Sequence, residues 1–483
     1  MTTGTTSRVA TIALLVLSTV DSRSVAQQPA LLNIPDQPPP APLAQVLQKY
    51  GPVTSERLKN PGDGDWLMIR RTYDGWGYSP LEQITARNVK GLQPVWVMST
   101  GMNNGQEAAP IVNGGVMFVS TSYNQVLAID AKTGAMLWRY RSPTPSNARG
   151  KPVSRGVALY GDRVFFALGE AMLVSLDAKT GKELWRTQIG DNSTGVYMTA
   201  APLIADGKII VGVSGGDGPN RGFVAAYNPD SGNPIWKTYT IPAPGERGSD
   251  TWRGEDWKTG GGATWVTGNY DAETNLVYWG TGNGYPWVGH ARPGDNLYVA
   301  STLAIDVSTG TIKGHFQYTP NESWDWDEVS PPILVDYRRG GRTIKGLINF
   351  ARSGYVYFLE RTGGTINFVE GKPYVKQNVF RSIDPKTGRP DIDPARKPDV
   401  GKVVDFCPSW HGAKNWQPGA YNPRTRMIYI PTQENLCAVM MGRTIETSSG
   451  ATRVATTNRM YIAPGADHLS EVQAWNVDTG KMV

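Results

Sequence analysis

VLAIDAKTGAMLW, residues 126–138, is one copy of a phrase that recurs along this chain. The other copies are LVSLDAKTGKELW (173–185), VAAYNPDSGNPIW (224–236), ITARNVKGLQPVW (84–96), TLAIDVSTGTIKGHF (302–316) and VQAWNVDTGKMV (472–483). The tryptophans that end the four clearest copies lie roughly 40–50 residues apart, which is the period of the blades of a β-propeller.

Each copy has the pattern of a β-hairpin that ends in a large aromatic residue. An alternating apolar run such as VLAID leads into Asp-x-x-Thr-Gly, whose glycine can adopt a positive φ and form a tight turn. Strand-like runs such as GVALYGDRVFFALG (156–169) and KIIVGVSGG (208–216) lie between the copies. Four strands therefore fit within one period. We predict an all-β propeller of stacked four-stranded sheets in preference to a β-sandwich or a solenoid.

The composition agrees with a large β-domain and excludes some classes of function. The 483 residues include 55 glycines, 35 prolines and 16 tryptophans, as expected for a fold with many turns and aromatic side chains. The formal net charge of +6 is small for this length, and no basic run of the nucleic-acid-binding type occurs. A slightly basic surface suits docking to an acidic redox partner.

The N-terminus has the pattern of an export signal. Arg8 precedes the apolar run VATIALLVLSTV (9–20), which is too short to span a bilayer, and SVA (24–26) offers small residues for cleavage. We predict three segments, which are a signal peptide (1–26), an N-terminal extension (27–59) and the propeller (60–483). The mature chain is expected in the periplasm without an integral membrane segment, and a retained anchor is the alternative.

The chain has two cysteines, Cys407 and Cys437. In an oxidising compartment they are expected to form a disulfide, and two free buried thiols are the alternative. No Cys-x-x-Cys-His sequence occurs, so the chain encodes no covalently attached c-type haem.

The repeated Asp-x-x-Thr-Gly-x-x-x-Trp phrase resembles the tryptophan-docking motif of quinoprotein alcohol dehydrogenases. These enzymes are eight-bladed β-propellers that carry pyrroloquinoline quinone (PQQ), a flat ortho-quinone with three carboxylates. The resemblance extends from about residue 60 to the last residue, and it includes separate local motifs in the family's order.

This resemblance implies a PQQ site built from short motifs. Arg155 in PVSRGVALYGD resembles the family's carboxylate-binding arginine, and Trp265 in GGGATWVTG matches the tryptophan under the quinone. Arg352 in LINFARSGYVYFLER is similar to the arginine at the reactive quinone oxygens. The implied cofactor-binding residues are Glu107, Arg155, Thr199, Ser214, Gly215, Gly216, Trp265, Arg352, Asn415 and Trp416.

A metal site is implied by SWDWDEV (323–329), which crowds acids beside tryptophans. Asp325 matches the family's catalytic aspartate, Asn283 its asparagine ligand, and Asp217 stands where the family usually has glutamate. Asp327 occupies a position at which an acid is associated with lanthanide-dependent members. A strand-like i, i+2 relation would place Asp325 and Asp327 on one side. Hard oxygen ligands suit one calcium or lanthanide ion and not zinc, and the extra acid favours the trivalent ion.

The implied reaction is oxidation of an alcohol to an aldehyde or ketone. The cation would polarise the C5 carbonyl of PQQ, Arg352 would hydrogen-bond to the quinone oxygens, and Asp325 would act as general base while hydride passes to C5. Electrons would leave to a soluble cytochrome c, because the chain carries no haem. A homodimer is compatible with this assignment, and the sequence does not identify the alcohol.

Two departures from the family pattern bear on this assignment. Family members carry adjacent cysteines shortly before the Val-x-Arg-Gly segment, whereas NARGKPVSRG (147–156) has none; Cys407 and Cys437 resemble the family's other pair. Family members also continue beyond the position of WNVDTGKMV (475–483) by roughly one to two blades of about 40–50 residues. We therefore expect the last blades to be incomplete or missing. The alternatives to an enzyme are a non-catalytic β-propeller that binds proteins and an inactive truncated remnant.

Overall fold

The computed structural model describes residues 43–446 and 452–483, so the predicted signal peptide lies outside the described residues. The described residues contain two short α-helices, α1 (Gln45–Gln48) and α2 (Ser55–Lys59). Six 3-10 turns accompany them, which are η1 (Val89–Gly91), η2 (Asn192–Thr194), η3 (Ser249–Thr251), η4 (Asp256–Thr259), η5 (Gly289–Ala291) and η6 (Pro394–Arg396). Within the described ranges no helix has the length and apolar character needed to cross a membrane.

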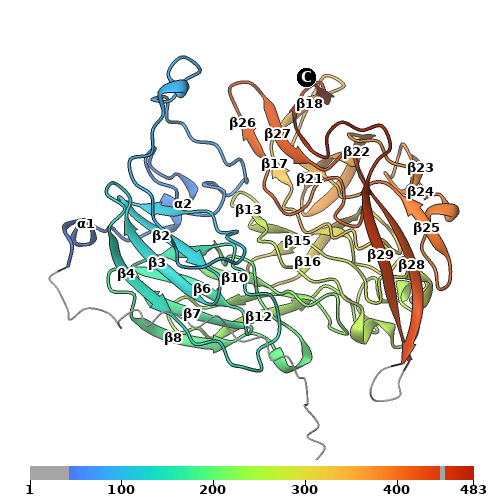
Figure 1. Ribbon diagram of the computed structural model, residues 1–483, viewed down its shortest axis with the longest axis horizontal. Helices are drawn as coiled ribbons and strands as arrows, with labels where there is room; N and C mark the ends of the chain where they lie inside the picture. Colours follow the sequence, from blue (N-terminus) through green and yellow to red (C-terminus); the bar gives the residue numbers. More distant parts are fainter. Residues whose placement is uncertain (1–42, 447–451) are drawn as a thin grey trace, which may run out of the picture. The chain divides into compact units, whose positions relative to one another are not determined.

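Four antiparallel sheets of four strands follow one another through the first two thirds of the chain (Figure 1). In each of them the strands pair in chain order. The first two contain β1 (Ile111–Asn113), β2 (Val116–Thr121), β3 (Gln125–Asp130), β4 (Met136–Arg141), and then β5 (Val157–Tyr160), β6 (Arg163–Leu168), β7 (Met172–Asp177) and β8 (Glu183–Gln188). The next two contain β9 (Leu203–Ala205), β10 (Lys208–Gly212), β11 (Phe223–Tyr227), β12 (Pro234–Tyr239), and then β13 (Asn269–Asp271), β14 (Leu276–Gly280), β15 (Ser301–Asp306) and β16 (Ile312–Gln317). This repeated meander confirms the predicted all-β, propeller-type fold.

Two further four-stranded sheets carry insertions. The first contains β17 (Ile333–Leu334), β20 (Gly346–Phe350), β21 (Tyr355–Thr362) and β22 (Thr365–Pro373), with the inserted hairpin β18 (Tyr337–Arg339) and β19 (Arg342–Ile344). The second contains β26 (Ala420–Asn422), β27 (Met427–Thr432), β30 (Glu471–Asn476) and β31 (Lys481–Met482). Its insertion is the long pair β28 (Leu436–Glu446) and β29 (Thr452–Ile462), which Figure 1 shows beside β25 (Val403–Phe406). A separate hairpin joins β23 (Phe380–Ile383) to β24 (Pro390–Ile392).

The two cysteines form a disulfide, as predicted from the expected compartment. Cys437 lies on β28, and its Cα is 4.4 Å from that of Cys407. The bond ties β28 to the loop that continues from Cys407 to Trp416, which contains two of the predicted cofactor residues.

The tryptophans of the repeated phrase connect each sheet to the next one. Trp138 at the end of the first sheet donates its indole N–H to the backbone oxygen of Ala178 at 3.0 Å. Its ring covers Gly181, where an added Cβ would lie 2.6 Å from the indole Cε3. Equivalent pairs of contacts link Trp96 to Ala131 and Gly134, Trp185 to Pro229 and Gly232, and Trp236 to Val307 and Gly310. Each turn glycine has a positive φ, so it provides both the turn and the space for the ring.

Two later turns use other side chains in the same position. Phe368 covers Gly388 in a DPKTG turn (384–388) that the sequence analysis did not recognise as a copy. Arg339 covers Gly480 in the last copy, and its Nη1 donates to the backbone oxygen of Val477 at 2.9 Å. The docking position therefore accepts side chains other than tryptophan.

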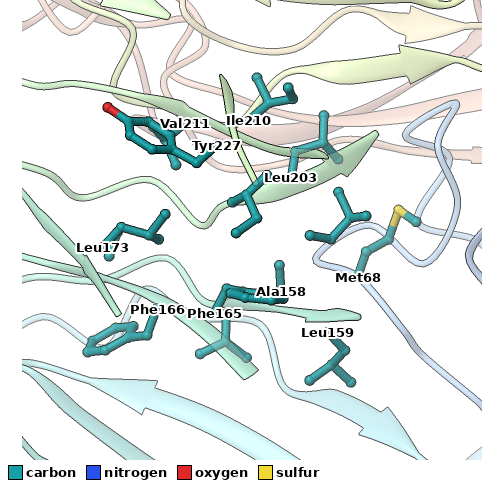
Figure 2. Packing of buried hydrophobic residues seen from close by; sticks show 14 of the residues in the cluster. Met68, Ala158, Leu159, Phe165, Phe166, Leu173, Leu203, Ile210, Val211 and Tyr227 are labelled. Atoms are coloured by element: carbon teal, nitrogen blue, oxygen red, sulfur yellow. The ribbon is translucent and has the colours of Figure 1, made fainter. Parts of the chain in front are cut away.

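The main core lies where the apolar faces of neighbouring sheets meet. Figure 2 shows buried side chains from β5, β6, β7, β9, β10 and β11 packed against one another and against Met68. The labelled residues are Met68, Ala158, Leu159, Phe165, Phe166, Leu173, Leu203, Ile210, Val211 and Tyr227. Because each sheet alone would expose these faces, stability depends on keeping neighbouring sheets in contact.

The Gly181→Ala substitution should reveal the energetic importance of this docking. Gly181 and Gly161 both have a positive φ, but an added Cβ at Gly161 meets nothing within 4 Å. We expect Gly161→Ala to cost about 1–2 kcal/mol from backbone strain alone. Gly181→Ala should cost a further amount of about 1–3 kcal/mol, because the methyl group would collide with Trp138. Urea unfolding midpoints measure both, and equal losses would contradict a special role for the tryptophan–glycine contact.

Candidate active site

Four of the predicted cofactor residues form one group that an ion pair and hydrogen bonds hold together. Glu107, Arg155 and Thr199 precede the first strands of three successive sheets. Arg155 Nη2 lies 2.6 Å from Glu107 Oε2, and Arg155 Nη1 donates to Thr199 Oγ1 at 2.6 Å. Thr199 Oγ1 is 3.0 Å from Ser214 Oγ. The first and last of these residues, Glu107 and Ser214, are more than one hundred positions apart in the sequence. The fold brings them together.

Two aromatic rings flank this group. The guanidinium carbon of Arg155 lies 4.7 Å from the centre of the Trp265 ring and 5.1 Å from the centre of the Trp416 ring. Burial lowers the pKa of Arg155, and the charge of Glu107 opposes that shift. The buried Nε–H of Arg155 has no hydrogen-bond partner among the described residues. A cation with an unused donor beside flat aromatic faces suits a planar ligand with carboxylates.

Two glycines allow a close approach of backbone segments beside this group. Gly215 has a φ of 109°, and an added Cβ there would lie 2.4 Å from the backbone oxygen of Gly195. An added Cβ at Gly216 would lie 2.9 Å from that of Ala263. The next residue, Asp217, is exposed and accepts a hydrogen bond from Trp287 Nε1 at 3.1 Å. The turn therefore leaves Asp217 accessible.

The acidic stretch 323–329 takes its shape from Glu322, which the sequence analysis did not single out. Glu322 is fully buried, and its Oε1 accepts the backbone N–H groups of Trp324 and Trp326. Its Oε2 lies 4.0 Å from Nη2 of the buried Arg292. The rings of Trp324 and Trp326 stack with their centres 5.0 Å apart and are completely buried. The two tryptophans therefore belong to the core under the loop and do not form a cofactor face.

The predicted strand-like relation between Asp325 and Asp327 is wrong. Residues 323–329 form no strand, and Asp325 has a φ of 68°. The N–H of Asp327 donates to the backbone oxygen of Asp325 at 3.1 Å, which makes a tight turn. The physical reason is that the Glu322 carboxylate gathers two nearby N–H groups and so competes with an extended backbone.

Asp327 is held by two hydrogen bonds and one ion pair. Its Oδ1 accepts the Asn283 backbone N–H at 2.7 Å, and its Oδ2 accepts Trp265 Nε1 at 3.1 Å. Arg352 Nη2 lies 3.4 Å from the same Oδ2. Burial raises the pKa of Asp327, and the charge of Arg352 opposes the rise. Asp327 therefore ties three other predicted site residues together.

Asp325 differs from Asp327 because its buried Oδ1 has no hydrogen-bond partner within the described ranges. Burial, together with the negative charges of Asp217 and Asp327, raises the pKa of Asp325 well above its usual value. A carboxyl group in this environment favours binding of a proton or a cation. In the described chain, however, the carboxylate oxygens of these three aspartates do not all lie within 4.8 Å of one another.

Arg352 connects the acidic stretch to the Asn415 loop. Its Nη1 donates to the backbone oxygen of Asp325 at 3.1 Å, and its Nη2 donates to Asn415 Oδ1 at 3.1 Å. Its guanidinium carbon lies 5.7 Å from the centre of the Trp265 ring. The Arg352 backbone N–H donates to Glu328 Oε1 at 2.9 Å, so the buried Glu328 positions Arg352. Burial raises the pKa of Glu328 to about 8.

Two residues near this site, Tyr197 and Lys414, were not predicted. Lys414 is buried, and its Nζ donates to Ser330 Oγ at 3.3 Å and to the backbone oxygen of Asn415 at 3.2 Å. It lines a cavity of about 30 Å³ together with Trp416, which gives room for about one water molecule. In the sequence, Lys414 stands out only because it precedes the predicted residues Asn415 and Trp416 in HGAKNW.

Comparison with known proteins identifies the family of this chain. Residues 66–387 match the family model described as "Glucose/ethanol/alcohol dehydrogenase, beta-propeller domain", a PQQ family. The chain therefore belongs to the PQQ β-propeller family.

Individual relatives support the same assignment. The quinoprotein alcohol dehydrogenase PedH of Pseudomonas putida is 42% identical over 74% of this chain. A lanthanide-dependent methanol dehydrogenase of Methylacidiphilum fumariolicum is 34% identical over 86% of this chain and 74% of its own length. The solved structure of a europium-containing methanol dehydrogenase superimposes with a TM-score of 0.83 at 33% identity, covering 89% of this chain and 79% of that one. The matched part of this chain spans 64% of the length of PedH.

Lys414→Met should change how stability depends on pH. Burial lowers the pKa of Lys414 from 10.5 to about 8, so between these values the unfolded chain binds a proton that the folded chain does not. The free energy of unfolding should therefore gain about 3 kcal/mol from Lys414 as pH rises from 8 to 10.5. Lys414→Met should remove this gain, while Lys132→Met at an exposed turn should keep it. Urea unfolding at several pH values measures the difference, and parallel pH profiles for wild type and Lys414→Met would contradict it.

Proposed function

We propose that this chain binds PQQ and one hard cation and oxidises an alcohol to an aldehyde or ketone. The observation that carries the proposal is the buried Asp325 Oδ1, which has no hydrogen-bond partner among the described residues and lies on the loop that Arg352 contacts. Membership of the PQQ family supports the cofactor, and the printed names of the relatives support the substrate class.

The residues present fit PQQ. Arg155 and Arg352 are cations near the Trp265 ring, and both keep a buried Nε–H without a hydrogen-bond partner in the described part of the chain. These groups match the carboxylates and ring oxygens of the cofactor. The Trp265 ring matches one of its flat faces, and Trp416 lies beside Arg155. Arg155 would bind a cofactor carboxylate, and Glu107 would hold Arg155 in place through their ion pair.

The donor set also fits a hard cation. Asp325, Asp327, Asp217 and Asn283 offer oxygen ligands, and the buried Oδ1 of Asp325 has no hydrogen-bond partner among the described residues. Asp325 and Asn283 would be the main ligands, because both oxygens of Asp327 already accept hydrogen bonds. Similarity to lanthanide-dependent and europium-containing relatives favours a lanthanide over calcium.

The chemistry divides between the cofactors and the chain. When bound, PQQ supplies a two-electron acceptor, and the cation supplies a Lewis acid. Asp325 would accept the proton of the alcohol hydroxyl, and its buried Oδ1 has no hydrogen-bond partner among the described residues. Arg352 is held by Asp327, Asn415 and the Glu328 carboxylate, so it is oriented before any ligand arrives.

The remaining parts of the proposal concern the whole protein. We place the mature enzyme in the periplasm, as an eight-bladed propeller that delivers electrons to a soluble cytochrome c. The export-type N-terminus supports the periplasmic assignment.

Reconstitution of the full chain tests the proposal. The purified protein is loaded with PQQ and either Ca²⁺ or La³⁺, and both retained quinone absorbance and alcohol-dependent dye reduction are measured. We expect PQQ retention with either ion and faster turnover with La³⁺. Asp325→Asn should retain PQQ but lose about 100-fold or more in rate, because the proton acceptor is gone. Asp230→Asn, a substitution of an exposed aspartate on a hairpin turn, is the control.

The possible outcomes separate the competing functions. Turnover with Ca²⁺ alone would keep the enzyme and contradict the preference for a lanthanide. PQQ retention without turnover under any condition would favour an inactive remnant. A folded chain that retains no PQQ would contradict the proposal and favour a non-catalytic propeller.

A further inference from the structure

The segment before Arg155 makes a close contact with Tyr197. Gly150 has a φ of 118°, and an added Cβ there would lie 2.5 Å from Tyr197 Cγ. The backbone of Gly150 therefore lies directly against the tyrosine ring, and only glycine fits both the conformation and the space. No cysteine occurs in this segment, so the contact is made by packing alone.

Asn192 fixes this arrangement from the other side. Its Oδ1 accepts the Arg149 backbone N–H at 2.9 Å, and its Nδ2 donates to the Arg149 backbone oxygen at 2.9 Å. The same Nδ2 donates to the backbone oxygen of Val196 at 2.8 Å. One side chain thus joins the residue before Gly150 to the residue before Tyr197.

Tyr197 is also tied directly to the proposed cofactor site. The Ser214 N–H donates to the Tyr197 backbone oxygen at 2.8 Å. Burial raises the pKa of Tyr197 to about 12, with smaller contributions from Asp217 and Asp327 and an opposing one from Arg155. The phenol therefore lies within electrostatic range of the residues proposed to hold the cation and the cofactor carboxylate. It stays uncharged at neutral pH, and its side chain is half-buried.

We propose that Tyr197, backed by the Gly150 turn and locked by Asn192, is a cover that packs on bound PQQ and slows its release. This inference rests on the proposed function, because it concerns the same cofactor. The cover needs the aromatic ring and a rigid support, and it needs neither the phenol hydroxyl nor a disulfide.

The release rate of PQQ tests this role without relying on turnover. The full chain is loaded with PQQ and La³⁺ and separated from free cofactor, and the loss of bound quinone absorbance is followed over time. We expect Tyr197→Ala and Asn192→Ala to release PQQ about tenfold faster, which corresponds to the upper range of one aromatic packing contact. Tyr197→Phe should stay within about twofold of wild type, because it keeps the ring.

Gly150→Ala provides a second test with a matched control. It should also release PQQ faster, because the methyl group would push the turn away from the ring, whereas Gly161→Ala at an open left-handed turn should not. Unfolding midpoints verify that each variant is folded. Wild-type release rates for both Tyr197→Ala and Asn192→Ala would overturn the cover while leaving the proposed function intact. Fast release from Tyr197→Phe would overturn the packing role in favour of a hydroxyl contact. Wild type that never retains PQQ would overturn the proposed function and this inference together.

Discussion

The contact between an indole ring and a turn glycine in the next sheet is the constraint on which the rest of this structure depends. Trp138, Trp185 and Trp236 join consecutive sheets in this way, and Trp96 packs on the first sheet. Each ring lies over a glycine with a positive φ and donates its N–H to a nearby backbone oxygen. Each sheet has two apolar faces and cannot bury both by itself. The tryptophan–glycine contacts therefore also hold the apolar faces of neighbouring sheets together. At two later turns Phe368 and Arg339 cover the glycine, so side chains other than tryptophan also fit this position.

The candidate site follows from this arrangement because its residues come from the loops that begin successive sheets. Glu107, Arg155 and Thr199 are far apart in the sequence and meet only because the docking contacts set the positions of β1, β5 and β9. Bringing buried charges together costs free energy unless each charge has partners. Most of them do, since Arg352, Asp327 and Glu322 are bonded on several sides. The buried Oδ1 of Asp325 has no hydrogen-bond partner among the described residues, which makes Asp325 a candidate for proton or cation binding.

Much of this could be predicted from the sequence, and the failures have physical causes. The repeated phrase predicted the sheets, and the local motifs named residues that do lie together around Arg155 and Arg352. The DPKTG turn was missed because its partner is Phe368 and not tryptophan. The shape of 323–329 was missed because Glu322 organises that backbone through hydrogen bonds. The alternating pattern of side chains in the sequence does not reveal such bonds. Tyr197 and Lys414 were missed because their importance arises from contacts with distant segments, namely the Gly150 turn and Ser330.

The central claim is that one ligand constellation binds PQQ and a cation in this chain. A crystal structure of the full chain soaked with PQQ and La³⁺, with data collected to reveal the anomalous signal of lanthanum, tests it most directly. We predict one strong anomalous peak bonded to Asp325 and Asn283, with quinone density between the Trp265 ring and Tyr197 and its carboxylates at Arg155. A peak at other residues, or quinone density away from Trp265, would contradict the assignment of this site.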